Sequence, residues 1–333
     1  MRSYRIGSLS AWMPEWIACK AICLREPTSL RRTPAGGDHF REMAVDLLEC
    51  ENRRVRYGIA LPTGGECGDP RFLVELAERA EAAGWDGIFP EDYVVYQGDP
   101  SMPTCPTWPT LAAVAVRTSQ LVLGVEVTPL ARRRPWNVAR EVAAVDQLSE
   151  GRVVLGVGLG DVGDHVTADA SFTHFGEERD ARRRGELLDE ALEIVTGLWT
   201  GETFSYHGKH FTVDEVRFLP RPVQQPRPPI WVGGGYPNPR PVERALRWDG
   251  ACLYNARRGP LPPEAVADLR TRAGERSWTI AVGGSPRRVD WDAEREHVTA
   301  ICEAGADWWV EWAQPADRET MRAVVDRGPL RVL

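Results

Sequence analysis

The stretch RVVLGVGLGD, residues 152–161, decides how the rest of the chain is interpreted. It begins with the apolar run 153–155, which is typical of a strand buried on both faces. Three glycines lie between this run and Asp161: Gly156, Gly158 and Gly160. Because glycine has no Cβ, a ligand can approach such a backbone closely. The same glycines also suit a plain turn, and they lack the GxGxxG spacing of dinucleotide-binding folds.

Segments with strand and helix patterns alternate along the chain on both sides of this stretch. Besides the stretch itself, strands are predicted at 57–61, 87–90, 121–127, 229–232, 250–253, 278–282 and 306–311. Helices are predicted at 69–83, 110–116, 135–148, 239–247, 262–276, 292–303 and 316–326. Asp69 and Pro70 are typical of a helix start, and Gly84 is typical of a helix end.

Eight strand–helix units predict an α/β fold in which a parallel sheet closes into a (βα)8 TIM barrel. The alternative is an open doubly wound sheet, which eight units would crowd. A long insertion, roughly residues 161–228, separates strands four and five. It contains a predicted helix at 179–199 and a predicted hairpin that begins at Thr203 and turns at 207–209. Such an insertion lies on the C-terminal face of the barrel, where barrel enzymes build their active sites.

Residues 1–54 differ from the rest, because they show no periodicity apart from a short helical pattern at 39–51. We predict a poorly ordered N-terminal extension over 1–54, followed by one barrel domain over 55–333. We expect the extension to be dispensable for function.

Composition and charge narrow the class of protein. The net charge of −7 argues against binding to nucleic acid or to an anionic membrane, and it favours a small-molecule substrate. The seven cysteines are scattered without zinc spacing, which predicts reduced thiols, no metal site and a cytoplasmic location. No apolar run reaches the roughly 18 residues that a transmembrane helix needs.

Several ordered blocks of sequence resemble the bacterial luciferase-like monooxygenases, a family of flavin- or deazaflavin-dependent barrel oxidoreductases. The blocks are YGIALP at 57–62, AERAEAAGWDGIFPEDY at 77–93, the whole segment 121–161, FGEERDARRRGELLDEALEIVTGLWTGE at 175–202, LPRPVQQPRPPIWVGGG at 219–235 and RWDGA at 247–251. The resemblance implies that FMN or the deazaflavin coenzyme F-420 binds at the C-terminal face of the barrel, with a small organic molecule as substrate.

The resemblance also implies cofactor-binding residues. Gly158 and Gly160 fall where the family brings a strand against the cofactor, and Gly233, Gly234 and Gly235 match a second backbone cradle. Plain turn glycines are the alternative for both sets. In similar proteins a non-proline cis peptide near Val125 and Glu126 backs the ring, which predicts such a bond before one of these two residues. Glu126 either lies near the ring or pairs with an arginine among 132–134.

Three residues are candidates for proton transfer. Asp161 stands where some deazaflavin-dependent relatives carry an acid, although a loop cap is equally consistent. Tyr93 replaces the histidine that many relatives carry after an aspartate, and it is either a proton donor or a wall of the site. His165 is the third candidate, with a surface histidine as the alternative. An arginine among 182–184 either faces the cofactor or lies on a solvated helix face.

Two reactions and one non-catalytic function are consistent with these residues. With FMN, the resemblance implies an oxygen-dependent monooxygenase. With F-420, it implies hydride transfer without oxygen. The missing histidine motivates the third possibility, a flavin-binding barrel without catalysis. A reductase that supplies reduced cofactor and a homodimer are the predicted partners.

Overall fold

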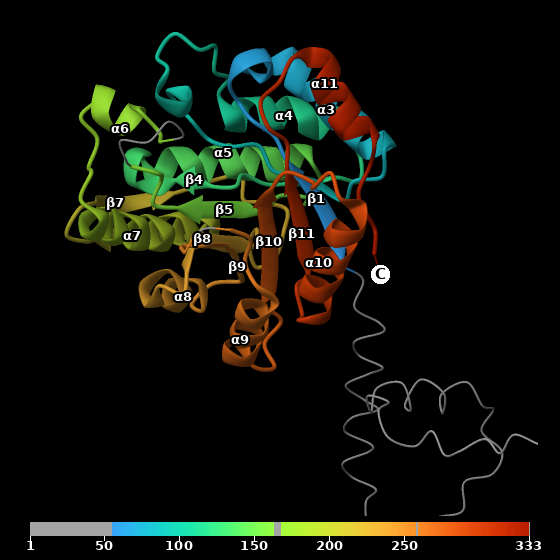
Figure 1. Ribbon diagram of the computed structural model, residues 1–333. Coiled ribbons are helices and arrows are strands. Elements are labelled where there is room, and N and C mark those ends of the chain that lie inside the picture. Colours follow the sequence, from blue (N-terminus) through green and yellow to red (C-terminus); the bar gives the residue numbers. More distant parts are fainter. Residues whose placement is uncertain (1–54, 163–167, 258, 333) are drawn as a thin grey trace, which may run out of the picture. The chain divides into compact units, whose positions relative to one another are not determined.

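The computed structural model describes residues 55–162, 168–257 and 259–332 (Figure 1). The predicted extension over 1–54 and the candidate His165 lie outside the described residues. Among the described residues no helix has the length and apolar character needed to cross a membrane.

The described residues form a closed barrel with eight parallel strand positions (Figure 1). The strands are β1 (Arg56–Ala60), β2 (Gly87–Ile88), β3 (Val122–Leu123), β4 (Thr128–Pro129), β5 (Leu155–Gly158), β8 (Ile230–Tyr236), β9 (Gly250–Asn255), β10 (Thr279–Ser285) and β11 (Trp308–Trp312). They follow the order β3-β2-β1-β11-β10-β9-β8-β5-β4. β3 and β4 divide one strand position, and Leu123 also pairs in parallel with Val153 just before β5. The two ends of the order therefore meet, which confirms the predicted (βα)8 fold.

A helix follows each strand position and covers the outside of the barrel (Figure 1). These helices are α3 (Pro70–Ala82), α4 (Thr107–Arg117), α5 (Pro135–Leu148), α7 (Ala181–Trp199), α8 (Pro239–Ala245), α9 (Pro263–Ala273), α10 (Trp291–Glu303) and α11 (Arg318–Asp326). An aspartate side chain accepts a backbone N–H at the start of four of them: Asp69, Asp180, Asp290 and Asp317. The predicted start of α3 is therefore confirmed.

The interior of the barrel is filled by aromatic side chains. Phe89 stacks on Trp231 with ring centroids 5.8 Å apart and meets the edge of Trp308 at 5.4 Å. Gly58 makes room for this plug, because a Cβ there would lie 2.5 Å from the Phe89 ring. A larger apolar core fills the layer between strands and helices. The plug closes the interior below the C-terminal ends of the strands, where the chain is left free to form a site.

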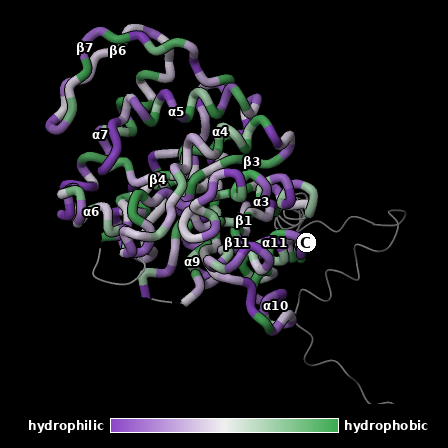
Figure 2. Tube along the Cα trace, turned by 90° about the horizontal axis from the view of Figure 1, so that it is seen from above, coloured by the Kyte–Doolittle hydropathy of each residue, from purple (hydrophilic) through white to green (hydrophobic). Residues whose placement is uncertain are grey.

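The predicted insertion contains the short helix α6 (Ser171–His174), α7 and an antiparallel hairpin of β6 (Thr203–His207) and β7 (Thr212–Arg217). The hairpin lies at the edge of the molecule near α5 and α7 (Figure 2). Phe211 in its turn packs edge-on against Trp136 of α5, with centroids 6.2 Å apart. The insertion is thus a packed outer layer of the barrel.

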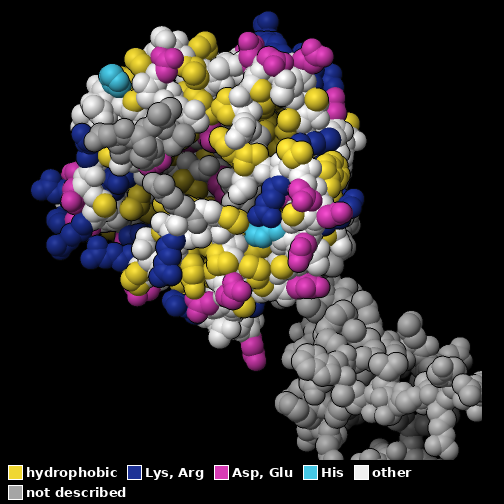
Figure 3. All heavy atoms as spheres, in the orientation of Figure 1, with side chains coloured by type: hydrophobic (Ala, Val, Ile, Leu, Met, Phe, Trp, Pro, Cys, Tyr) yellow, Lys and Arg dark blue, Asp and Glu magenta, His cyan; other side chains and the backbone are white. Residues whose placement is uncertain are grey.

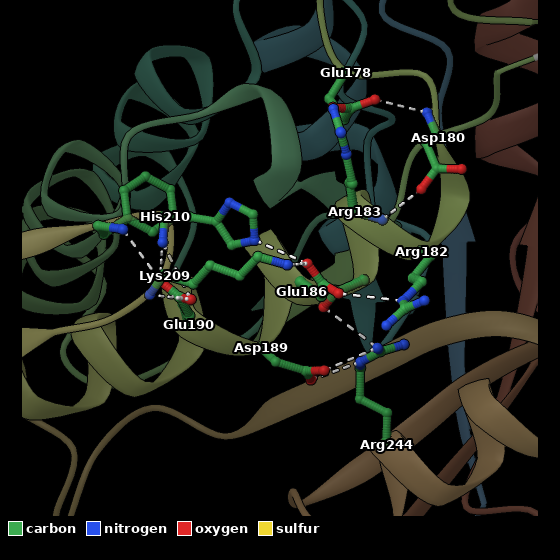
Figure 4. A network of polar contacts seen from close by, with 12 residues as sticks. Glu178, Asp180, Arg182, Arg183, Glu186, Asp189, Glu190, Lys209, His210 and Arg244 are labelled. Atoms are coloured by element: carbon green, nitrogen blue, oxygen red, sulfur yellow. Dashed lines mark hydrogen bonds and ion pairs between the residues drawn. The ribbon is translucent and has the colours of Figure 1, made fainter.

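Polar contacts fasten the hairpin turn to α7 (Figure 4). The Glu190 carboxylate accepts the backbone N–H groups of Lys209, His210 and Phe211 at distances of 2.8–3.1 Å. Glu186 pairs with Lys209 at 2.7 Å, and this ammonium holds the pKa of Glu186 at about 2. On the other side, Asp189 binds Arg244 of α8 at 2.8 Å. These contacts fix α7, whose first turn supports the candidate site.

Candidate active site

A cleft of about 490 Å³ opens at the C-terminal ends of the strands. Its lining includes Ala60, Glu91, Tyr93, Gln97, Glu126, Val127, Asp161, Gly233, Gly234, Cys252, Leu253, Tyr254, Gly283 and Trp312. Figure 3 shows a hollowed face with hydrophobic side chains in yellow and acidic ones in magenta. All eight strand positions, or the loops that follow them, contribute to this lining, so the barrel itself holds the cleft in shape.

The structure brings five of the predicted site residues together in this cleft: Tyr93, Glu126, Asp161, Gly233 and Gly234. They come from loops and strands as far apart in sequence as β2 and β8. The other predicted residues that the structure describes do not line the cleft: Val125, Gly158, Gly160 and Gly235.

The glycines outside the cleft support it from behind. A Cβ on Gly158 would lie 2.5 Å from the Val127 side chain, which itself lines the cleft. Gly160 has a φ of +79°, and a Cβ there would lie 2.6 Å from the Phe172 ring. The plain-turn alternative therefore describes Gly160 best, because its backbone conformation and close packing both require glycine. Gly234 differs from its neighbour Gly233, because its Cβ would meet Pro241 of α8 at 2.4 Å.

The third strand position is interrupted between β3 and β4, where the cleft has its floor. The non-proline cis peptide joins Glu126 and Val127. The prediction of such a bond near Val125 and Glu126 is confirmed, but the predicted position is wrong by one residue. Val125 is 1% exposed and packs in the apolar core, whereas Glu126 and Val127 line the cleft.

Glu126 does not pair with the neighbouring arginines, so that alternative is wrong. Arg132 pairs with Asp92 and Asp169, Arg133 pairs with Asp92 and Glu141, and the Arg134 guanidinium lies over the Trp136 ring. Burial, together with the nearby charge of Glu91, raises the pKa of Glu126 to about 7.

Glu91 is a site residue that sequence reasoning missed. It follows β2 and accepts a hydrogen bond from the indole N–H of Trp312 at 3.2 Å. Burial raises the pKa of Glu91 to about 7, although hydrogen bonds from Tyr96 and Trp312 favour its charged form. A carboxylate at the end of a buried strand was the available signal, but the contact with Trp312 spans 221 residues and has no local pattern.

Tyr93 and Asp161 differ in exposure. The Tyr93 ring packs edge-on against Tyr96 with centroids 4.9 Å apart, and burial together with the charges of Glu91 and Asp161 raises the pKa of the phenol. Asp161 is exposed at the rim, and its carbonyl oxygen accepts the backbone N–H of Asp169 at 2.9 Å. The phenol is therefore kept protonated beside the cleft, while the carboxyl is accessible from solvent.

Buried ion pairs join the two segments that carry Tyr93 and Asp161. The Arg132 side chain, 3% exposed, contacts Asp169 at 3.1 Å and also binds Asp92, the residue before Tyr93. Arg133 contacts Asp92 at 3.0 Å. The loop after β2 and the segment that follows Asp161 are thereby joined through one guanidinium.

Arg184 in the first turn of α7 settles which side of the predicted arginine cluster is buried. Its guanidinium donates to the carbonyl oxygens of Leu159 and Gly160 at 2.7 and 2.8 Å. Arg182 and Arg183 are exposed. Arg184 therefore supports the glycine turn after β5. Arg182 and Arg183 lie on a solvated helix face, which was one of the two alternatives predicted for this cluster.

The fold and the cleft together define a class: a barrel enzyme with its site at the C-terminal ends of the strands, built around a glycine-rich fourth strand. Comparison with known proteins then identifies the family. Residues 55–325 match the luciferase-like monooxygenase family, so the chain belongs to it. This confirms the resemblance inferred from the sequence, and it makes the protein an oxidoreductase of the flavin- and deazaflavin-dependent class.

Individual relatives fall in the same class. The chain is 33% identical over 269 residues to an F-420-dependent hydroxymycolic acid dehydrogenase of Mycobacterium tuberculosis, covering 78% of this chain and 70% of the relative. It is 31% identical over 172 residues to an F-420-dependent glucose-6-phosphate dehydrogenase of Microbacterium testaceum. That match spans about half of each protein, 50% of this chain and 48% of the relative.

Solved structures with similar folds share so little sequence with this chain that they support the fold alone. An F-420-dependent secondary alcohol dehydrogenase in complex with an F-420–acetone adduct superimposes with a TM-score of 0.66 at 16% identity, covering 82% of this chain and 96% of that one. The monooxygenase RslO1 from Streptomyces bottropensis gives a TM-score of 0.65 at 22% identity, covering 81% and 96%.

Proposed function

We propose that the protein transfers a hydride between coenzyme F-420 and a small organic substrate, with both bound in the cleft at the C-terminal end of the barrel. One observation carries the proposal: Tyr93, Asp161, Val127 and the Gly233–Gly234 backbone line one cleft. The 33% identity with an F-420-dependent dehydrogenase supports F-420 over FMN. FMN with oxygen is the second candidate, since the family includes monooxygenases.

The residues present fit a flat ring cofactor. The cleft volume of about 490 Å³ lies within the usual range for small-molecule sites, about 300–1,000 Å³. A Cβ on Gly233 would lie 2.7 Å from Val127, so only glycine leaves the backbone free on this side. Val127, Gly233 and Gly234 would hold the cofactor. When bound, F-420 supplies hydride chemistry, and FMN supplies hydride or oxygen chemistry.

The chain itself provides proton transfer and exclusion of water. Tyr93, whose pKa is raised, donates a hydrogen bond to a substrate oxygen or nitrogen at neutral pH. Asp161 at the rim exchanges a proton between substrate and solvent. The aromatic plug beneath the cleft keeps water from entering through the barrel.

Turnover of two variants tests these assignments. General acid–base groups contribute about 10²–10⁴-fold, so Asp161→Asn and Tyr93→Phe should each lower turnover by at least about 10²-fold. Cofactor affinity, measured by quenching of cofactor fluorescence, should stay within a few-fold because neither change alters the ring cradle. Normal turnover in Asp161→Asn would make Asp161 a loop cap and leave Tyr93 or His165 as the candidate.

Oxygen consumption separates the two cofactors. The proposal expects oxidation of F-420 or its reduction without oxygen uptake, whereas oxygen uptake with reduced FMN would favour the monooxygenase. Binding of cofactor without turnover of any substrate would support the non-catalytic barrel. A partner reductase, a homodimer and a cytoplasmic location stay predictions from the sequence.

A further inference from the structure

Gln97 lines the cleft with a neutral carboxamide. It lies in the loop after β2 and is half-buried. Among the described residues that line the cleft, it is the only one with an amide side chain. An amide both donates and accepts hydrogen bonds, so Gln97 differs in chemistry from the carboxyl and aromatic groups around it.

The backbone of Gln97 has a conformation that residues other than glycine rarely adopt. Its φ of 45° and ψ of 42° lie in the left-handed region, and Gly98 follows with a φ of 77°. This region is unfavourable for a residue with a Cβ, and residues held there are concentrated at functional sites. Glycine at position 97 would avoid the strain, so the position points to a function for the carboxamide itself.

A hydrogen bond fixes the direction of the carboxamide. Gln97 Nε2 donates to the Tyr96 hydroxyl at 3.2 Å. The Tyr96 hydroxyl donates its single hydrogen to Glu91, so it accepts from Gln97 and faces the NH₂ end of the amide. The Gln97 oxygen Oε1 accepts no hydrogen bond from the described part of the chain. Gln97 therefore keeps one acceptor and one N–H donor for a ligand.

Tyr96 is itself held firmly in place. Its side chain is fully buried, and its ring meets the Tyr93 ring edge-on with centroids 4.9 Å apart. It also packs against the loop after β1, where a Cβ on Gly64 would lie 2.1 Å from the ring. One buried tyrosine thus supports both Gln97 and Tyr93, the proposed donor to the substrate.

The contacts of Gln97 lead away from the cradle proposed for the cofactor ring. Glu91, the acceptor of the Tyr96 hydroxyl, also accepts the indole N–H of Trp312 on β11. In the barrel β11 lies between β1 and β10, whereas the residues of the ring cradle lie just before β4 and on β8. Gln97 therefore belongs to the part of the lining that the ring cradle leaves for the substrate.

We propose that Gln97 determines substrate specificity, because its carboxamide binds a second hydroxyl group on an alcohol substrate. The reacting oxygen meets Tyr93, and the second hydroxyl meets the remaining acceptor and donor of Gln97. The inference rests on the proposed function, because it takes the cleft as the substrate site.

Calorimetric titration of the full chain, saturated with whichever cofactor binds, tests this assignment. The probes are the cyclohexanediols whose hydroxyls lie on non-adjacent ring carbons. Each is paired with the methylcyclohexanol in which a methyl group replaces the second hydroxyl. The measured quantity is the affinity of each diol divided by the affinity of its methyl analogue.

Gln97→Met removes the hydrogen-bonding groups and keeps the length of the side chain. For at least one pair of probes, it should lower the affinity ratio by about fivefold or more, which corresponds to about 1 kcal/mol, the net contribution of one hydrogen bond. Unchanged ratios for every pair in folded Gln97→Met would overturn the proposal.

Gln97→Gly separates substrate binding from folding. Glycine adopts the left-handed backbone without strain, so the urea midpoint should not fall, while the affinity ratio should fall as in Gln97→Met. A lower midpoint with an unchanged ratio would assign Gln97 to stability alone. Gln120→Met removes an exposed carboxamide outside the cleft and should change neither quantity.

Cofactor affinity distinguishes the two proposals. All three variants should bind cofactor as the wild type does, because neither position belongs to the ring cradle. A chain that binds no cofactor overturns the proposed function together with this inference. Normal cofactor binding with unchanged affinity ratios overturns only the role of Gln97.

Discussion

Substitution of Arg132 by methionine should unfold the loops that carry the candidate catalytic residues before it affects the barrel core. The guanidinium is buried, with 3% of its side chain exposed, and it contacts Asp169 at 3.1 Å and Asp92. Methionine fills much of the same volume and removes the charge. Asp92 keeps its contact with Arg133 at 3.0 Å, so the loss falls mainly on Asp169.

The size of the expected loss of stability follows from the burial of Asp169, the carboxylate left without its partner. Removal of one partner of a buried ion pair costs about 3–5 kcal/mol, because the remaining charge stays buried without compensation. We expect Arg132→Met to lower the free energy of unfolding in urea by that amount. Arg134→Met, at an exposed neighbouring arginine, should change it by no more than about 0.5 kcal/mol.

A double variant decides whether the ion pair is the cause. Arg132→Met combined with Asp169→Asn removes both charges, so it should recover part of the stability that Arg132→Met loses. A loss below about 1 kcal/mol in Arg132→Met, or additive losses in the double variant, would refute the argument that this guanidinium joins the two loops.

Two further predictions concern pH and the N-terminal residues. Glu126 has a pKa of about 7 in the folded protein against about 4.5 when unfolded, so the folded state binds more protons between these values and stability falls as pH rises from 4.5 to 7. Urea unfolding at a series of pH values should show that the free energy of unfolding falls by about 2 kcal/mol less in Glu126→Gln than in the wild type over this range. The same fall in stability in the variant and the wild type would contradict the burial of a titrating carboxyl at Glu126. Deletion of residues 1–54 should leave the melting temperature and cofactor affinity nearly unchanged, and aggregation of the shortened chain or loss of cofactor would show that the barrel needs them.

The fold was predictable because its signals are local. Helix α5 has the bounds Pro135–Leu148 that the sequence predicted, since a proline begins it and the apolar positions repeat with helical spacing. The third strand is the exception. Its pattern over 121–127 reads as one continuous strand, whereas the structure divides it into β3 and β4 around Glu126. Local patterning does not report such an interruption.

The site was predictable only in part, because its contacts join distant segments. Tyr93 and Asp161 follow strand ends and Gly233 lies in β8. Parallel strands bring their carboxyl ends to one face, so the three residues line one cleft as expected. The partner of Glu91 is Trp312 on the last strand, and the partners of Arg132 are Asp92 and Asp169. A single sequence contains no signal that selects these partners among many acidic, basic and aromatic residues.

The central claim is that the cleft at the C-terminal ends of the strands holds the cofactor, and fluorescence titration of the full chain with F-420 and with FMN tests it most directly. We predict saturable binding of one of them at one molecule per chain. Gly233→Val, whose side chain would enter the space beside Val127, should weaken this binding at least about tenfold while the far-ultraviolet circular dichroism stays unchanged. Ala144→Val on the exposed face of α5 should bind as the wild type does. Failure of both cofactors to bind, or equal affinity in folded Gly233→Val, would contradict the claim.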